Sequence, residues 1–156
     1  MVPLSQALGP MFDVRIATHS ELSEVESLYA ICGYRGGVDE ADTTFLARSR
    51  DQLIGAVRIC AEHGVTVLRG MHVLPSFQRQ GVGSQLLTTT LPLLNQGPSY
   101  CLPYSHLVSF YGAASFQTAG PDDLPDFLRD RLAVYVARGQ DIIAMSRSVT
   151  HGAIQP

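Results

Sequence analysis

The sequence predicts one α+β domain with a mixed, mostly antiparallel sheet. Its 156 residues are the length of a single domain, and 46% of them are hydrophobic, which is sufficient to form a core. Three β-rich runs in the first half are separated by short turns, as in an antiparallel meander. Segments with helical periodicity precede and follow this meander, so we expect helices to flank the sheet.

The expected order of elements is β-α-β-β-β-α-β-α-α-β. Residues 12–17 alternate between polar and apolar side chains and form the first strand. Thr18 or Ser20 then caps a helix that ends near Gly33. The segment 33–42 is polar and rich in glycine, and we expect it to be a loop.

The meander and a second helix follow this loop. Its strands are expected at residues 43–50, 53–61 and 65–74, and Gly70 in the last of them indicates a β-bulge or a close backbone approach. Helical periodicity resumes at Gly81. A short buried strand, two helices and a final strand are expected after it, at residues 99–103, 105–115, 122–138 and 141–147.

The domain is expected to extend over residues 12–148. Residues 1–11 contain two prolines and a glycine and are expected to be a loose leader, and residues 149–156 a loose tail. The leader has neither the basic start nor the long apolar run of a signal peptide. No apolar run in the sequence reaches the roughly 18–20 residues of a membrane span.

Charge and composition exclude several classes of function. The formal charge is −3, whereas binding to nucleic acid or to an anionic membrane requires a basic face. All 11 basic residues are arginine, which excludes Schiff-base chemistry, a pyridoxal-phosphate lysine and a P-loop. The three cysteines, Cys32, Cys60 and Cys101, lack the spacing of a zinc site, so we expect no metal. They are expected to be reduced thiols of a cytoplasmic protein.

The segment 73–87 carries the strongest chemical signal. A strand ends at Pro75, a short polar loop follows, and Gly81 and Gly83 open an apolar helix. The N–H groups at a helix N-terminus are unpaired and partly positive, and the glycines leave room for a phosphate to approach them. We therefore expect a pyrophosphate site formed by the backbone of the loop, with the first and last side chains adding contacts, at Arg79, Gln80, Gly81, Val82, Gly83 and Ser84.

Three other patterns do not match this loop. A dinucleotide site requires G-x-G-x-x-G, and the third glycine is missing after Gly81 and Gly83. A P-loop requires a lysine. A serine-hydrolase elbow requires G-x-S-x-G, whereas Ser84 follows Gly83 directly.

The hexapeptide Gln78-Arg79-Gln80-Gly81-Val82-Gly83 resembles the acyl-CoA-binding signature Q/R-x-x-G-x-G/A of the Gcn5-related N-acetyltransferases (GNAT). The V-x-P before it, the apolar helix after it, and the order of elements from residue 12 to about 116 resemble the family too. The resemblance implies a GNAT-like fold, in which the mostly antiparallel sheet contains a splayed, bulged strand and is flanked by helices.

A second segment is similar to the family pattern F-Y-x-x-x-G-F. It contains Phe110, Tyr111 and Phe116, but Ser115 stands where the family usually has glycine. This departure is expected to alter the turn after the helix without touching Tyr111. The C-terminal third departs further, because the helix expected at residues 122–138 stands where the family usually has a strand pair.

The resemblance implies an N-acetyltransferase that moves an acetyl group from acetyl-CoA to a primary amine of a small molecule or peptide. The pantetheine arm would pair with the backbone of Met71, His72 and Val73, and the loop from Gln78 to Ser84 would hold the pyrophosphate. Tyr111 corresponds to the general acid that protonates the leaving thiolate.

The resemblance leaves the acceptor side open. Val67 and Arg69 are at the acceptor-facing positions of the bulged strand, and Arg69 is suited to a carboxylate. The base is Asp39 or Glu40 in the loop after the first helix, His72, or a water relay. The acceptor amine is not specified, and the family suggests a homodimer.

Two rival functions follow from the same residues. A non-catalytic acyl-CoA-binding or regulatory module on the same fold would explain the lack of an obvious base and the altered C-terminal third. The third hypothesis is that the loop binds another phosphorylated ligand, such as a nucleotide.

Overall fold

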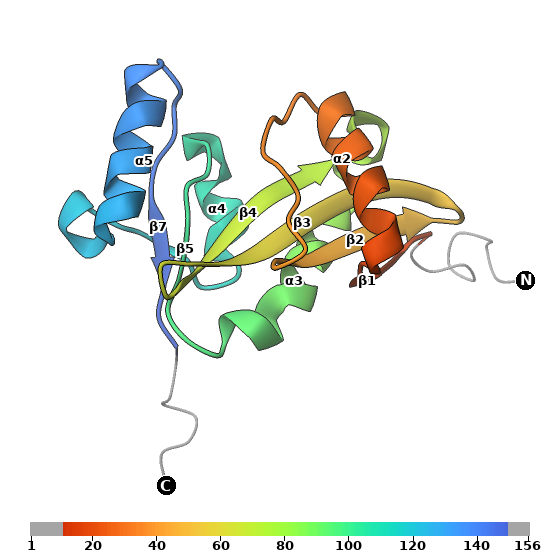
Figure 1. Ribbon diagram of the computed structural model, residues 1–156, viewed down its shortest axis with the longest axis horizontal. Helices are drawn as coiled ribbons and strands as arrows, with labels where there is room; N and C mark the ends of the chain where they lie inside the picture. Colours follow the sequence, from red (N-terminus) through yellow and green to blue (C-terminus); the bar gives the residue numbers. More distant parts are fainter. Residues whose placement is uncertain (1–10, 150–156) are drawn as a thin grey trace, which may run out of the picture. The chain divides into compact units, whose positions relative to one another are not determined.

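The computed structural model describes residues 11–149, and the rest of the expected leader and tail, at 1–10 and 150–156, lies outside the described residues. Seven strands are hydrogen-bonded in the order β1-β2-β3-β4-β5-β7-β6, with helices between them along the chain (Figure 1). Of the pairs with a described register, β4 and β5 run parallel and the others antiparallel. The predicted α+β class with a mixed, mostly antiparallel sheet is confirmed.

The described residues fall into two compact units. The first consists of residues 11–58 and 70–89, and the second of residues 59–69 and 90–149. The chain passes between them within β3, β4 and α3. No helix within the described part of the chain is long and apolar enough to cross a membrane.

The first unit contains the N-terminal strands and two helices. Its elements are β1 (Asp13–Ile16), the 3₁₀ turn η1 (His19–Glu21), α2 (Leu22–Ile31), β2 (Thr43–Ser49), the 3₁₀ turn η2 (Pro75–Phe77), and the adjoining parts of β3 (Gln52–Glu62), β4 (Val65–Val73) and α3 (Val82–Leu94). The predicted strands of this part and the start of the predicted helix at Gly81 are confirmed to within one residue.

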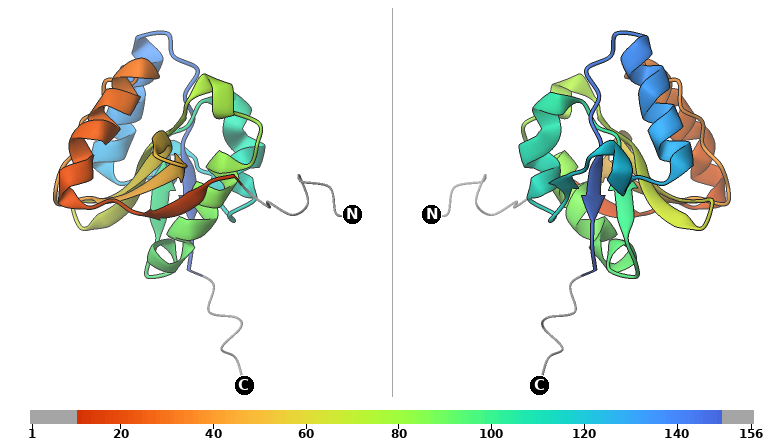
Figure 2. Two further views of the ribbon diagram at one scale, coloured as in Figure 1. Left: turned by 90° about the vertical axis from the view of Figure 1, so that its right-hand side faces the viewer. Right: turned by 90° about the vertical axis from the view of Figure 1, so that its left-hand side faces the viewer.

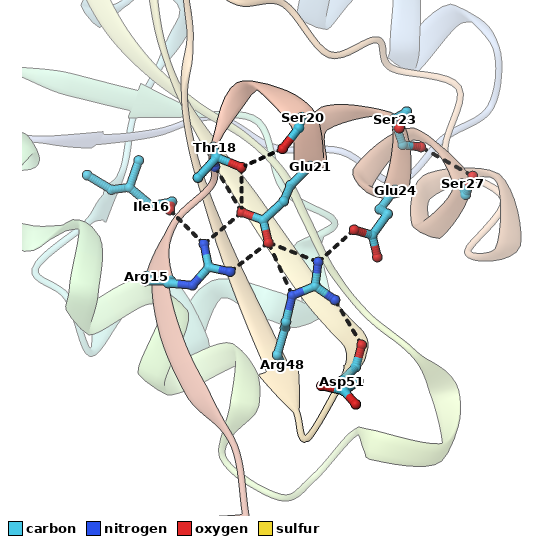
Figure 3. Close-up of polar contacts among 10 residues, drawn as sticks. All are labelled: Arg15, Ile16, Thr18, Ser20, Glu21, Ser23, Glu24, Ser27, Arg48 and Asp51. Atoms are coloured by element: carbon cyan, nitrogen blue, oxygen red, sulfur yellow. Dashed lines mark hydrogen bonds and ion pairs between the residues drawn. The ribbon is translucent and has the colours of Figure 1, made fainter.

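Thr18, one of the two predicted caps, begins η1. Its backbone N–H donates to Glu21 Oε1 (2.9 Å), and the two residues form a capping box. Glu21 also accepts hydrogen bonds from Arg15 Nη1 (2.7 Å) and Arg48 Nη2 (2.9 Å). Figure 3 shows the carboxylate between the two guanidinium groups, so this cluster joins β1, β2 and the start of α2.

Helices α2 and α3 cover opposite faces of the strands of the first unit (Figures 1 and 2). Gly55 and Arg58 are three residues apart on β3, so their Cα–Cβ directions point to opposite faces. Leu86 and Val82 of α3 lie 3.1 and 3.2 Å from the point where a Cβ of Gly55 would be. The guanidinium carbon of Arg58 lies 5.9 Å from the ring centroid of Tyr29 in α2.

The second unit contains the C-terminal strands and helices. Its own elements are β5 (Ser99–Cys101), the 3₁₀ turn η3 (Ser105–Leu107), α4 (Val108–Gly112), β6 (Gln117–Thr118), the 3₁₀ turn η4 (Pro121–Asp123), α5 (Asp126–Ala137) and β7 (Met145–Arg147). β7 pairs antiparallel with both β5 and β6, and it can be followed with α5 in Figure 2. The core of this unit includes Val67, Leu124, Leu128 and Ala144.

The last helix and the last strand of this unit differ from the prediction. The helix expected at residues 122–138 is interrupted: η4 ends at Asp123, Leu124 is extended (φ −108°, ψ 143°), and α5 begins at Asp126. The physical reason is Pro125, because the residue before a proline is disfavoured in the helical region. The strand expected at residues 141–147 is reduced to Met145–Arg147, with an isolated bridge between Ile142 and Tyr104.

Strand β6 was not predicted. Two exposed residues, Gln117 and Thr118, pair with Ser146 and Met145 of β7. The C-terminal third therefore contains a strand pair as well as a helix, and α5 lies between the two strands in the sequence rather than in their place.

Candidate functional site

The loop predicted to bind a pyrophosphate connects β4 to α3 in the first unit. After η2 the chain passes through residues 78–81 and enters α3 at Val82. The side-chain amide of Gln78 donates a hydrogen bond to the Val73 carbonyl oxygen (3.0 Å), and Gln80 Nε2 donates to Ser76 O (3.2 Å). The loop is therefore tied to the end of β4 and to η2 by its glutamine side chains.

Two loop residues have left-handed backbone conformations. The φ angle is +64° at Arg79 and +86° at Gly81. Left-handed residues close together in a loop are typical of backbones whose N–H groups converge on an anion. A Cβ on Gly81 would meet no atom within 4 Å, so its backbone conformation, not lack of space, requires glycine. The exposed residues of the loop are Gln78, Arg79, Gln80, Gly81 and Ser84.

Gly55 sets the distance between α3 and β3. A Cβ at this position would approach Leu86 Cδ1 to 3.1 Å and Val82 Cγ1 to 3.2 Å, closer than ordinary van der Waals contact. Val82 and Leu86 are themselves buried. The glycine therefore lets the first turns of α3 pack closely on the strand, which fixes where the helix N-terminus lies.

Strand β4 is bulged at Gly70, as predicted. At one end of the β3–β4 pair, Leu74 N–H donates to Ile54 O (2.8 Å), and at the other end a two-residue turn joins Glu62 to Val65. Between these two points β4 contains one residue more than β3, which is the definition of a bulge. Gly70 has φ +67° and marks the extra residue. A Cβ on Gly70 would overlap the hydroxyl oxygen of Tyr29, so glycine is required there by space as well.

The backbone groups after the bulge face alternate edges of β4. The His72 carbonyl oxygen lies 3.2 Å from the Cβ position of Gly55, so it faces β3. By alternation the backbone groups of Met71 and Val73 face the other edge. On that edge, the described pairing of β4 with β5 covers Thr66 and Val67.

His72 packs against two tyrosine rings. Its ring centroid lies 4.6 Å from that of Tyr34 and 5.8 Å from that of Tyr29. Burial lowers the pKa of His72 from its ordinary value of 6.5. The imidazole is therefore mostly neutral at pH 7, which is the protonation state of a base.

A buried ion pair beside His72 was missed by the sequence analysis. Arg58 is 3% exposed, and its Nη1 donates to Asp42 Oδ2 (2.8 Å) and its Nη2 to the hydroxyl of Tyr34 (3.0 Å). The signal was present in the sequence, because Arg58 interrupts the apolar strand 53–61 and a buried charge needs a partner. The pair fixes both ends of the loop 33–42 to β3.

Asp39 and Glu40, the two acidic candidate bases, lie on the surface of the same loop. Asp39 Oδ1 accepts a hydrogen bond from Ala41 N–H (2.8 Å), and Glu40 Oε1 lies 3.2 Å from His19 Nδ1. Both side chains belong to exposed residues. Within residues 11–149, no three His, Cys, Asp or Glu side chains are grouped so as to hold a metal ion.

Tyr111, the candidate acid, lies in α4 of the second unit and is 4% exposed. Its ring makes edge contacts with Phe110 and Phe116, at centroid distances of 4.9 and 6.0 Å. Burial, with a smaller contribution from Cys101, raises the pKa of Tyr111 above its ordinary value of 10.0. The phenol therefore stays protonated at neutral pH and is able to donate a hydrogen bond.

Ser115 has a left-handed backbone conformation in the turn after α4. Its φ angle is +74°, in the left-handed region that glycine adopts readily and serine does not. Ser115 N–H bonds to Gly112 O (3.0 Å), and Phe116 N–H bonds to Tyr111 O (3.3 Å). Serine at this position therefore strains the turn after α4.

The two candidate acceptor-binding residues, Val67 and Arg69, lie in the part of β4 that belongs to the second unit. Val67 is 1% exposed and belongs to the core with Leu124 and Leu128, so its side chain offers no surface to an acceptor. Arg69 Nη1 lies 3.5 Å from Glu62 Oε2, and Glu62 is also bound by Arg131 at 2.6 Å.

Residues 40–118 match the model of a known family, the acetyltransferase (GNAT) domain. This match covers half of the chain. The chain belongs to the GNAT acetyltransferase family. The matched part of this GNAT protein contains the loop 78–84, the bulged strand and Tyr111. A search of the curated proteins found no match.

Solved structures of acetyltransferases share the fold of this GNAT protein. N-acetylglutamate synthase from Neisseria gonorrhoeae, complexed with coenzyme A and N-acetyl-glutamate, superposes with a TM-score of 0.66 at 17% identity. The match covers 90% of this chain and 35% of the synthase, so the chain spans about a third of the length of that protein.

Two further structures match over nearly their whole length. The ribosomal-protein-S18-alanine N-acetyltransferase from Escherichia coli has a TM-score of 0.67 at 13% identity, covering 91% of this chain and 96% of that chain. Naa50 from Arabidopsis thaliana, in complex with a bisubstrate analogue, has a TM-score of 0.61 at 16% identity, covering 88% and 99%. Identities this low support a shared fold and do not transfer a substrate.

Proposed function

We propose that this protein transfers an acetyl group from acetyl-CoA to a primary amine of a small molecule or peptide by direct attack. The observation that carries the proposal is the exposed segment 78–81, which has left-handed residues at Arg79 and Gly81 and leads into the N-terminus of α3. The backbone N–H groups of residues 79–84 bind the pyrophosphate, and the Arg79 guanidinium adds a positive charge. The backbone of Met71 and Val73 pairs with the pantetheine arm.

The reaction forms one C–N bond and breaks one C–S bond. Acetyl-CoA supplies the thioester, and the neutral amine attacks its carbonyl carbon. A base takes the proton that the amine loses, and Tyr111 gives a proton to the departing thiolate sulfur. Solvent then restores the proton of Tyr111 and removes the proton of the base.

We favour His72 as the base. It lies on the bulged strand, two residues after Gly70, which distorts the strand, and burial keeps it mostly neutral at pH 7. Asp39 and Glu40 remain the alternatives, because their exposed loop follows the first helix. Replacement of each in turn by the isosteric amide, or by glutamine for His72, separates the three: the residue whose loss lowers kcat about 100-fold is the base. Equal losses of less than tenfold for all three favour a water relay.

For the acceptor we propose a broad chemical class, a primary amine. The similar structures were solved with N-acetyl-glutamate or with a bisubstrate analogue, and one acts on a ribosomal protein's alanine by its name. An amino acid, a small amine or a peptide N-terminus therefore belongs in the first panel of acceptors, and Arg69 is the residue we propose for an acceptor carboxylate.

The proposed location is the cytoplasm. Its reducing conditions suit the three free thiols of Cys32, Cys60 and Cys101.

The test is the release of CoA thiol that depends on an added amine. The protein is incubated with acetyl-CoA and a panel of amines, amino acids and peptides, and free thiol and acetylated product are both measured. Thiol and product in equal amounts support the proposal. Acetyl-CoA binding without amine-dependent release across the panel favours instead a non-catalytic acyl-CoA-binding module. Displacement of acetyl-CoA by ATP would favour the hypothesis that the loop binds a nucleotide.

A further inference from the structure

The loop 33–42 is rich in glycine, yet its two ends are held by one side chain. Arg58 donates to Tyr34 near the start of the loop (3.0 Å) and to Asp42 at its end (2.8 Å). The Arg58 and Asp42 side chains are 4% and 11% exposed. A charge-assisted pair with so little exposure is strong, because breaking it would leave a buried charge without compensation. The loop is therefore fixed on the face of β3 that α2 covers.

The fixed loop places the ring of Tyr34 against the imidazole of His72. The two rings are tilted by 33° with their centroids 4.6 Å apart. Tyr29 of α2 meets Tyr34 edge to face at 4.8 Å and approaches His72 at 5.8 Å. Aromatic contacts from two segments outside β4 thus restrict rotation of the His72 side chain.

We propose that Tyr34 is a positioning residue for His72, and that the Arg58–Asp42 ion pair holds Tyr34 in place. This inference rests on the proposed acetyl transfer with His72 as its base. In this arrangement the Arg58 guanidinium fixes the Tyr34 phenol, and the phenol fixes the His72 ring that takes the proton. The bulge at Gly70 makes room for this arrangement, because Tyr29 occupies the space of the missing side chain.

Burial keeps the imidazole of His72 mostly neutral at pH 7. Tyr29 and Tyr34 present phenol rings, and the positive charge of Arg58 is matched by the negative charge of Asp42. Cys32, which approaches the neighbouring Val73 carbonyl oxygen (3.9 Å), has a pKa raised by burial and stays a thiol. The neutral imidazole takes a proton from the amine nitrogen as the C–N bond forms, and it returns the proton to solvent after the C–S bond has broken.

The experiment compares two replacements of Tyr34. Tyr34→Leu removes the ring, and Tyr34→Phe keeps the ring while losing the hydrogen bond from Arg58. The pKa of the His72 imidazole is measured by NMR titration, assigned with His72→Gln, and the pH profile of kcat/KM is measured with the best acceptor. Tyr104→Leu is the matched control, because Tyr104 is an exposed tyrosine stacked on another histidine, His106.

For the wild type we expect the NMR pKa of His72 to lie below 6.5 and to coincide with the acid limb of kcat/KM, because burial lowers this pKa. Tyr34→Leu admits water, moves both values toward 6.5 and lowers kcat roughly tenfold, with acetyl-CoA affinity unchanged. Tyr34→Phe stays within about threefold of the wild type, and Tyr104→Leu has no effect. Asp42→Asn, which loosens the loop without removing a ring, lowers kcat as Tyr34→Leu does, but the unmatched charge of Arg58 opposes a rise in the pKa of His72.

A folded Tyr34→Leu variant in which neither the NMR pKa of His72 nor kcat changes would overturn the inference. If Tyr34→Leu does not fold, a folded Asp42→Asn variant with an unchanged kcat would overturn it as well. Failure of the proposed function looks different. In that case no amine supports turnover. If instead the pKa of His72 moves in Tyr34→Leu while the acid limb of kcat/KM does not, His72 is not the base and Tyr34 is not its positioning residue.

Discussion

The side-chain amide nitrogen of Gln78 lies 3.0 Å from the carbonyl oxygen of Val73 and donates a hydrogen bond to it. Gln78 opens the loop, and Val73 is the last residue of the bulged strand β4. The bond therefore couples the two parts that we propose to hold the cofactor, the strand for its pantetheine arm and the loop for its pyrophosphate. A glutamine or arginine at this position of the motif has a structural reason here, because either side chain is able to donate to the strand.

Gln78→Ala should weaken acetyl-CoA binding about fivefold. The expected loss corresponds to one neutral hydrogen bond of about 1 kcal/mol that no longer fixes the loop to the strand. Isothermal titration with acetyl-CoA measures it, and Gln96→Ala, at an exposed glutamine after α3, is the control. Equal affinity in the Gln78 and Gln96 variants would show that the bond does not organise the site.

Tyr111→Phe should lower kcat about 10- to 100-fold and leave the Kd of acetyl-CoA within twofold. The hydroxyl is proposed to protonate the thiolate, whereas the buried ring packs equally well without it. Steady-state kinetics and cofactor titration on one preparation measure both quantities. An unchanged kcat would remove Tyr111 from the role of acid.

Ser115→Gly should stabilise the protein by about 0.5–1 kcal/mol, which corresponds to a Tm higher by roughly 1–4 °C. The φ angle of +74° strains serine and suits glycine. Ser109→Gly in the neighbouring helix α4 is the control, and it should destabilise by a similar amount because glycine weakens a helix interior. A lower Tm for Ser115→Gly would contradict the strained turn.

Glu21 should make folding stability depend on acid pH. The pKa of its carboxyl group is held far below the ordinary value of 4.5, chiefly by hydrogen bonds from Arg15 and further by Thr18 and Arg48. A depressed carboxyl pKa contributes stability that is complete above pH 4.5 and is lost as the pH falls below it.

Glu21→Gln should therefore lower the free energy of unfolding at pH 7 by roughly 1–3 kcal/mol, and the difference from wild type should shrink as the pH falls from 5 toward 3. Urea denaturation at a series of pH values measures it. Glu26→Gln, at an exposed carboxylate of α2, serves as the control and should cost little at any pH. A difference that stays constant down to pH 3 would contradict the role assigned to Glu21.

Local signals in the sequence predict most of the first unit. The meander follows from short turns between β-rich runs, and the bulge at Gly70 follows from a glycine within a β-rich run. The strand β6 carries no such signal. A pair of exposed residues, Gln117 and Thr118, shows no periodicity, and its pairing with β7 depends on where the chain returns after α5.

The surroundings of His72 depend on contacts between distant residues. Tyr29, Tyr34 and Asp42 meet Arg58 and His72 because α2, its following loop and two strands fold together, and no spacing in the sequence encodes that meeting. The burial of Val67 has the same origin. Alternation along β4 predicts which residues share a face with Val67, but only the packing of α5 makes this face part of the core.

The most direct test of the account is the binding of acetyl-CoA, measured as a thermal shift on the wild type, Gly81→Ala and Gly97→Ala. At about 100 times its Kd, acetyl-CoA should add roughly 2.7 kcal/mol and raise the Tm of the wild type by roughly 5–10 °C. Gly97→Ala should shift equally, because a Cβ there meets no atom within 4 Å and no left-handed backbone is required. Gly81→Ala, forced into φ +86°, should show a much smaller shift. No shift in the wild type, or the same shift in all three proteins, would contradict the assignment of loop 78–84 as the acetyl-CoA site.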